Sequence, residues 1–383
     1  MTWNFIEHIS LLGNVVVSFV LPFLFVLTII VFFHELGHFL VARWCGIKVL
    51  VFSVGFGPEL VGFKDRYGTR WKLSAIPLGG YVKFFGDDNA ASMPDARAIE
   101  AMSPEERRVS FVHQNVWKRA AVVVAGPLAN FVLAIVIFAA VFMTLGKQET
   151  APRVDTVLPD SAAAEAGFQS GDLVLSINGR AIESFRDMQE IVAVSPGERL
   201  DIVVDRGGAK VNLHATPRLT ADKDIFGNVQ RIGRLGLSQT NSPSDIKTIK
   251  FGPVGALAEA GKQTWFVIDQ SVTYIGKLLV GRASTDQLGG PLRIAQMSGQ
   301  AASLGFATLM NWAGLISVSI GFLNLFPIPL LDGGHLLFYV IEAARGRPLS
   351  ERVQEFGFRV GLALLLMLMI FTFWNDIAHF AAS

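Results

Sequence analysis

The sequence predicts a polytopic α-helical membrane protein with about four transmembrane helices, an inserted α+β domain outside the cytoplasm and a membrane-associated β-hairpin. The first observation is composition, because 51% of the 383 residues are hydrophobic and only 17% are charged. Soluble domains are about a quarter charged. The second observation is a set of long apolar segments, and the third is the polar stretch 146–306 that interrupts them.

The apolar segments approach or exceed the roughly 20 residues that cross a bilayer core. They are Ile9–Val41, Ala120–Leu145, Ala307–Leu331 and Phe356–Ile377. The first is not a cleaved signal peptide, because no basic region precedes it and its apolar run is too long. The fourth is short, and Arg359 at its edge is expected to extend toward the membrane surface.

Basic residues set the expected orientation. Lys and Arg are concentrated in the loops 43–119 and 345–352, and neither terminus carries any. The positive-inside rule therefore places both loops in the cytoplasm, and both termini and the segment 146–306 outside it. The net charge of +1 gives no electrostatic reason to expect nucleic-acid binding.

A metal-binding motif lies in the first apolar segment. His34-Glu35-Leu36-Gly37-His38 places two histidines on one helix face at the spacing that zinc requires, with a glutamate between them that can transfer protons. Each ionisable residue inside a span costs about 2.5–3.5 kcal/mol on insertion scales, so this cluster indicates a functional site. Cys45 is the only cysteine, which excludes an internal disulfide and a zinc–thiolate site.

The third ligand is expected from the segment Asn324–Gly334, because catalytic zinc usually keeps three protein ligands. The first and third spans both run from outside to inside, so Asp332 lies at a depth similar to that of the histidines. Asp332 could instead be a helix-terminal aspartate before a Gly-Gly turn. His335 is a rival ligand, although an interfacial histidine explains it more simply.

Pro327 and Pro329 interrupt any helix that follows Asn324. Irregular backbone at membrane depth is tolerated only where it lines protein or a water-filled cavity, and hydrolysis requires such water. The Asn324 amide could hold a substrate strand or a developing oxyanion, or it could hydrogen-bond between helices. Glu35 would act as general base, with pairing to a basic residue in the bundle as the alternative.

These motifs carry a family resemblance. Together with Gly126-Pro127-Leu128-Ala129-Asn130, they resemble the site-2 protease (M50-type) family of intramembrane zinc metalloproteases. Further matching segments are Phe52–Gly57, Pro77–Lys83 and Leu288–Pro291, and the resemblance as a whole extends over nearly the entire chain. The resemblance implies one Zn²⁺ per chain, held by His34, His38 and Asp332, with Glu35 as the catalytic glutamate.

The resemblance also implies the biology. Members of this family in the bacterial inner membrane make the second cut in single-pass membrane proteins, such as anti-sigma factors, and in remnant signal peptides. We therefore expect a multi-pass inner-membrane protein with periplasmic termini and an active site toward the cytoplasm. Two other classes stay open, a membrane scaffold without catalysis and a metal-ion transporter.

The segment Trp71–Phe85 alternates in hydrophobicity around Gly79-Gly80 and predicts a hairpin. Its apolar side chains suggest that it dips toward the membrane near the active site. The family is thought to present substrate as an added strand beside such an edge, which makes Gly79, Gly80 and Tyr81 candidate substrate-binding residues. Alternatively, the hairpin only packs on the bundle.

The segment Arg153–Pro217 predicts a compact external α+β unit. Ala166-Gly167-Phe168, Gly171-Asp172 and Ile177-Asn178-Gly179 resemble a PDZ domain of the kind attached to bacterial proteases. Such a domain could capture a peptide by strand addition or exclude bulky ectodomains. Close bacterial relatives often carry two PDZ domains in tandem, whereas this chain has length for one.

The expected organisation follows from these assignments. The domains are 1–45 (first span with HExxH), 46–116 (cytoplasmic loop with hairpin), 117–147 (second span), 150–220 (PDZ domain), 221–303 (connecting segment with an amphipathic helix), 304–341 (third span) and 355–380 (fourth span). The amphipathic helix begins near Phe251, and its aromatic residues, such as Trp265, suit a membrane interface.

Overall fold

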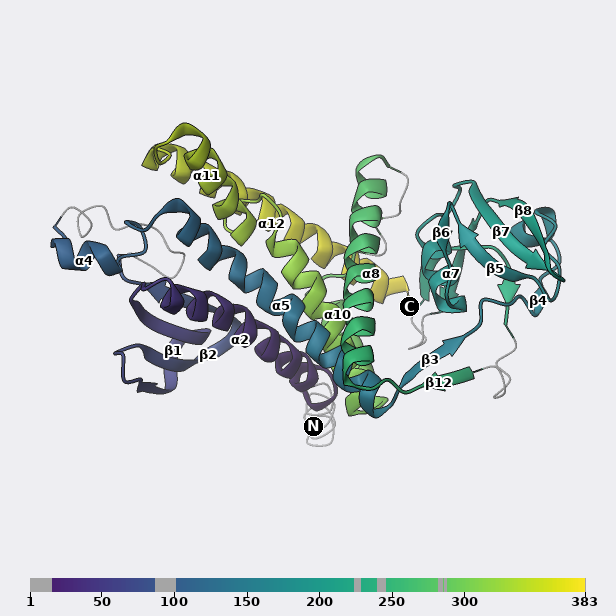
Figure 1. Cartoon of the computed structure of the whole chain (residues 1–383), viewed down its shortest axis with the longest axis horizontal. Helices are drawn as coiled ribbons and strands as arrows, with labels where there is room; N and C mark the ends of the chain where they lie inside the picture. Colours follow the sequence, from purple (N-terminus) through teal and green to yellow (C-terminus); the bar gives the residue numbers. More distant parts are fainter. Residues whose placement is uncertain are drawn as a thin grey trace, which may run out of the picture. The chain divides into compact units, whose positions relative to one another are not determined.

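The computed structural model describes residues 16–86, 101–223, 229–239, 246–281, 285 and 288–382. The chain forms two compact units (Figure 1). One comprises Met1–Phe138 with Gly290–Trp374, and the other comprises Ala139–Gly289 with Asn375–Ser383. The predicted start of the first span, Ile9, lies outside the described residues.

Within the described parts of the chain, four helices are long and apolar enough to cross a membrane, which confirms the predicted spans. They cover Val16–Trp44, Val116–Thr144, Phe306–Asn324 and Arg352–Ala378. The corresponding elements are η1 (Val16–Val20) with α2 (Leu21–Trp44), then α5 (Val116–Thr144), α10 (Phe306–Asn324) and α12 (Glu351–Ala382). Three further helices are α4 (Pro104–Val109), α9 (Pro291–Ser303) and α11 (Asp332–Arg345).

The third span is shorter than the predicted Ala307–Leu331. Helix α10 ends at Asn324, because Pro327 and Pro329 lack the backbone N–H that would continue it. The chain re-enters helical structure at Asp332, the first residue of α11. The break expected at the two prolines is therefore confirmed, and a separate helix follows it.

Helices α2 and α5 cross with almost no space between their backbones. A Cβ built on Gly37 of α2 would lie 2.3 Å from the Ala125 carbonyl oxygen of α5. Small residues of this kind let membrane helices approach closely. The crossing therefore fixes how the HExxH face of α2 meets α5.

The loop between α2 and α5 contains a long ribbon of two strands, β1 (Val49–Lys64) and β2 (Arg70–Phe84). The segment Val49–Val54 has β2 partners on both sides, for example Phe52 with Val82 and with Trp71. The ribbon is thus folded on itself, and Gly80–Phe84 forms one outer strand. Its apolar face packs on α2 through a shared core with residues such as Phe39 and Phe52.

The turn predicted at Gly79-Gly80 is wrong. Both glycines lie within β2, and the chain reverses between Lys64 and Arg70. Gly79 adopts φ 132°, and a Cβ on Gly80 would lie 2.8 Å from the Ser53 carbonyl oxygen. These glycines therefore serve a bend and a close backbone approach inside the strand.

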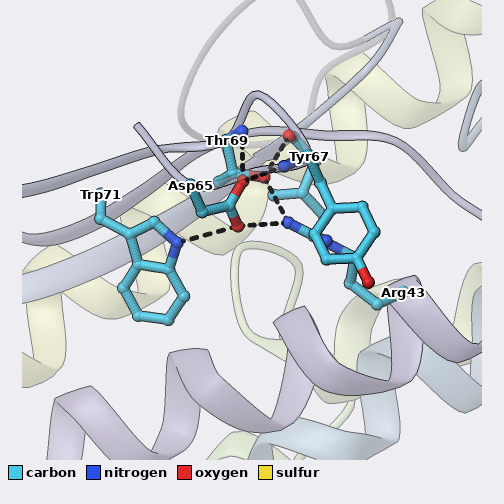
Figure 2. A network of polar contacts seen from close by, with 6 residues as sticks. Arg43, Asp65, Tyr67, Thr69 and Trp71 are labelled. Atoms are coloured by element: carbon cyan, nitrogen blue, oxygen red, sulfur yellow. Dashed lines mark hydrogen bonds and ion pairs between the residues drawn. The ribbon is translucent and has the colours of Figure 1, made fainter. Parts of the chain in front are cut away.

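The turn of the ribbon is tied to the end of α2 (Figure 2). Asp65 accepts hydrogen bonds from the Arg43 guanidinium at 2.5 Å, from the backbone N–H of Tyr67 and Thr69, and from Trp71 Nε1. Burial raises the pKa of Asp65, but these donors outweigh it and hold the pKa below its usual value. The network fixes the ribbon to the catalytic helix.

The second unit is a small α/β assembly. Its elements are β3 (Lys147–Thr150), β4 (Thr156–Val157), α6 (Ala162–Glu165), β5 (Leu173–Ile177), β6 (Arg180–Ala181), α7 (Phe185–Ala193), β7 (Leu200–Arg206), β8 (Ala209–Ala215), β9 (Arg218–Lys223), β10 (Val229–Arg234), β11 (Leu237–Ser238), β12 (Ile246–Ile249) and α8 (Pro253–Leu279). The strand order β6-β5-β7-β8 forms its main sheet. The α+β structure predicted for Arg153–Pro217 is present in the elements β4 to β8 with α6 and α7.

Two ion pairs organise this unit. Asp172 is fully buried and accepts two hydrogen bonds of 2.8 Å from Arg206. Lys277 of α8 pairs with Glu198 at 2.7 Å and also donates to Ser195 Oγ at the end of α7. Helix α8, the predicted amphipathic helix, is therefore bound to the sheet domain rather than separate from it.

Candidate active site

His34, Glu35 and His38 project from one face of α2, as the i and i+4 spacing predicts. His38 Nδ1 lies 2.8 Å from the carbonyl oxygen of Val122 in α5. Because a carbonyl can only accept, the ring nitrogen Nδ1 must donate. In the neutral ring, His38 Nε2 therefore carries a free lone pair, the form that binds a metal.

The two imidazoles and Asp332 converge. The distances are 3.2 Å between His34 Nε2 and His38 Nε2, 3.1 Å between His34 Nε2 and Asp332 Oδ2, and 3.5 Å between His38 Nε2 and Asp332 Oδ1. Ligand atoms about 2.0–2.2 Å from a tetrahedral zinc lie about 3.3–3.5 Å apart. The spacing of this donor set therefore fits a zinc ion.

The polar atoms at the centre support this fit. Asp332 Oδ2 is buried and makes no hydrogen bond of acceptable geometry within the described part of the chain, although His34 Nε2 is close. A buried carboxylate oxygen without a donor is costly. A cation shared with the imidazoles would satisfy it, and among the described residues these three form the metal-binding cluster.

Helix α5 shapes the site from its other side. A Cβ on Gly126 would lie 2.3 Å from His38 Nε2 and 2.9 Å from His34 Cε1, so glycine alone leaves room for both rings. One turn later, the amide Nδ2 of Asn130 lies 3.3 Å from His34 Nδ1. The segment Gly126–Asn130 contributes to the family resemblance, but the sequence analysis predicts no function for its residues.

Asp332 reaches the site because the chain before it folds back tightly. A Cβ on Gly333 would lie 2.2 Å from the Phe326 carbonyl oxygen, and one on Gly334 would lie 2.5 Å from that of Ile328. The Gly-Gly pair thus allows the segment after α10 to cross the start of α11. Asp332 is also the first residue of that helix, so the helix-terminal position expected as the alternative is observed.

Helix α11 is held against α5 at its other end. The Arg119 guanidinium pairs with the Glu342 carboxylate and lies 4.8 Å from the centre of the Tyr339 ring. Both charged side chains are mostly buried. This contact keeps α11, and with it Asp332, beside the helices that carry the histidines.

A cavity of about 210 Å³ opens beside the three ligands. Glu35 lines it, together with Asn324 and the strand residues Gly80 and Tyr81. Gly79 does not, because it abuts the Phe56 ring instead. His335 lines the cavity as well, but it is not a member of the metal-binding cluster.

Two histidines on a membrane-spanning helix and Asp332 of α11 could hold a metal ion, with a glutamate and a cavity beside them, and this arrangement is typical of a membrane-embedded metallopeptidase. The sequence model described as Peptidase family M50 matches residues 22–368. The chain belongs to this family.

Relatives agree with this assignment. A relative from Rhizobium meliloti (strain 1021), whose name places it among the zinc metalloproteases, is 50% identical over 93% of this chain and 95% of its own length. Metalloprotease MmpA of Caulobacter vibrioides is 40% identical over 93% of this chain and 94% of its own. The regulator of sigma-E protease RseP of Salmonella typhimurium is 32% identical over 93% and 98%.

The chain is therefore a zinc metalloprotease of the inner membrane. Its family and its relatives give the enzyme class and the metal, and the apolar helices give the membrane. The cluster of His34, His38 and Asp332 provides a place for the zinc.

Proposed function

We propose that the chain is an intramembrane endopeptidase in which His34, His38 and Asp332 hold one zinc ion and Glu35 is the catalytic base. The observation that carries this proposal is the convergence of three ligand atoms from α2 and α11 at tetrahedral spacing. The His38 tautomer fixed by Val122 supports it, because it leaves Nε2 free for the metal.

Zinc bound there would polarise the scissile carbonyl and lower the pKa of the attacking water. Glu35 lines the same cavity and is placed to accept a proton from that water. The same carboxyl then returns the proton to the leaving amine nitrogen as the peptide bond breaks.

We propose that the substrate binds as an extended strand along Gly80–Phe84. A peptide bond inside a helix is shielded by the helix hydrogen bonds, so the substrate must unwind, and strand addition replaces the bonds it loses. A Cβ on Gly80 would lie 2.9 Å from Glu35 Cγ, which places this strand next to the catalytic carboxylate. Asn324, across the cavity, is suited to hold a backbone carbonyl.

The substrate class is proposed from the relatives and the membrane location. Single-pass membrane proteins already shortened by another protease fit a narrow cavity beside the spans. One relative is named a regulator of sigma-E protease, so membrane-anchored anti-sigma factors are our first candidates, with remnant signal peptides second.

We propose that residues 150–220 form a single PDZ domain in the periplasm, with both termini on that side and the active site toward the cytoplasm. Support comes from the strand order β6-β5-β7-β8, with α7 packed in the same core, and from the distribution of basic loop residues. In this position the domain would exclude bulky ectodomains rather than capture peptides.

The test is a comparison of wild-type protein with Glu35→Gln in detergent or liposomes. We expect Glu35→Gln to retain one zinc per chain and to lose cleavage of a truncated single-pass substrate by at least about 10²–10⁴-fold. Chelation of zinc from the wild type should abolish cleavage, and added zinc should restore it.

Each alternative function predicts a different result. A scaffold would bind no stoichiometric zinc, and a metal-ion transporter would move metal across liposomes with Glu35→Gln as well as with wild type. Cleavage by Glu35→Gln at the wild-type rate would disprove the catalytic assignment.

A further inference from the structure

Asn130 lies at the centre of the first unit but is not one of the expected metal ligands. Its side chain is completely buried in α5, and its amide Nδ2 is 3.3 Å from His34 Nδ1. Its amide oxygen has no hydrogen-bond partner among the described residues. A buried amide in this state requires a functional or structural reason.

Different groups of α5 lie beside the Nδ1 atoms of the two histidines. His38 Nδ1 donates to the Val122 carbonyl, which fixes its ring and leaves Nε2 for the metal. His34 Nδ1 instead lies beside the side-chain amide of Asn130. If His34 Nε2 binds zinc, its Nδ1 carries a proton and needs an acceptor.

Rotation of the Asn130 amide by half a turn exchanges its nitrogen and its oxygen. The oxygen then occupies the position beside His34 Nδ1 and accepts the ring proton. The same rotation removes the unpartnered oxygen from its present position. Both histidines would then have an oxygen acceptor on α5, a backbone carbonyl for one and an amide for the other.

Asn130 cannot easily move away from His34. On α10, a Cβ on Gly321 would lie 3.1 Å from the Asn130 Cβ, so this helix packs directly against the side chain. The Ser317 hydroxyl of the same helix donates at 2.8 Å to the Asn130 backbone carbonyl, and the helical backbone of α5 holds that carbonyl without it. Packing on α10 therefore holds the amide against the imidazole.

We propose that Asn130 is a positioning residue of the zinc site, whose amide oxygen accepts the His34 Nδ1 proton and directs Nε2 to the metal. This inference rests on the proposed function, because it requires His34 to be a zinc ligand. It gives a role to the last residue of the Gly-Pro-Leu-Ala-Asn segment. Loss of such a partner typically lowers metal affinity about 10–100-fold.

The experiment measures zinc affinity of the full-length protein by equilibrium competition with a chelator. Asn130→Leu keeps the size of the side chain and removes the acceptor, and Asn130→Asp keeps the acceptor. We expect about 10–100-fold weaker zinc binding for Asn130→Leu, and at least wild-type affinity for Asn130→Asp. Ser317→Ala is the matched control, because it removes the contact to the Asn130 backbone and leaves the amide in place.

A second measurement separates positioning from simple packing. Substitution of Zn²⁺ by Co²⁺ gives an absorption spectrum that reports ligand geometry, and we expect Asn130→Leu to change it while Asn130→Asp and Ser317→Ala do not. If Asn130→Leu lowers the thermal stability of the zinc-free protein but leaves zinc affinity and the Co²⁺ spectrum unchanged, the proposal is wrong.

The outcome also distinguishes the two proposals. Absence of stoichiometric zinc binding by the wild-type protein would overturn the proposed function itself. Normal zinc binding by the wild type and by Asn130→Leu would leave that function intact and refute only the role of Asn130.

Discussion

Gly126→Ala should disturb the metal site without unfolding the protein. The added methyl group would lie 2.3 Å from His38 Nε2 and 2.9 Å from His34 Cε1. Normal contacts between such atoms need about 3.5 Å or more, so the His38 ring must shift by about 1 Å. Zinc ligands tolerate displacements of only about 0.2 Å. A misplacement of about 1 Å can cost roughly 100-fold in activity.

The fold should survive this substitution. The atoms that the methyl group meets belong to side chains, which can rotate away. Alanine is also favoured over glycine within a helix by about 0.8–1 kcal/mol. We therefore expect zinc affinity and cleavage to fall together, with cleavage reduced at least about 100-fold, while the zinc-free protein unfolds within a few degrees of wild type.

Two other glycines provide matched comparisons. A Cβ on Gly37 would meet the Ala125 backbone carbonyl at 2.3 Å, which cannot rotate away, so Gly37→Ala should unfold the protein at a clearly lower temperature. Gly276 of α8 has open space around it, so Gly276→Ala should change neither property. Wild-type zinc affinity and cleavage in Gly126→Ala would refute the proposed ring positions.

Three further outcomes are expected. Asp65→Asn should weaken the tie between ribbon and α2, raising KM for substrate without altering zinc affinity; a loss of zinc would contradict this role. Asn324→Ala should raise KM by about 3–10-fold, as loss of one hydrogen bond predicts, and an unchanged KM would exclude substrate contact. Arg206→Gln should lower the unfolding temperature, because it leaves the buried Asp172 carboxylate without its cation. Burial raises the pKa of Asp172, but Arg206 holds it below the usual value. The wild-type pair should therefore stabilise fully above about pH 4 and weaken below it, and a pH-independent loss would argue against the ion pair.

The three residues predicted as metal ligands lie together in the structure, and the sequence marks each of them by its surroundings. His34 and His38 are ionisable residues in a span, which is costly without a function. Asp332 is predicted from its depth in the membrane. The first and third spans run in the same direction, so their inner ends lie at the same side of the membrane. The structure places all three within coordination distance of a common point.

The features that the sequence did not predict share a physical cause. Asn130 and Gly126 contact His34 and His38 across helices that are distant in sequence, and no local sequence pattern reveals such contacts. The Gly79-Gly80 pair looked like a turn because glycine is common in turns, whereas here it permits a bend and a close backbone approach. The separate helix α11 was missed because its apolar residues continue the hydrophobic character of the preceding span.

The connection between α10 and α11 gives zinc a mechanical role. Two ligands come from α2, locked to α5 by a crossing without free space, while the third belongs to a helix joined to its predecessor by a non-helical segment. In the proposed site, a bound ion would thus add a removable cross-link between α11 and the α2–α5 pair, beside the Arg119–Glu342 contact. Conditions that pull those parts away from each other would then release metal even though both imidazoles stay in position.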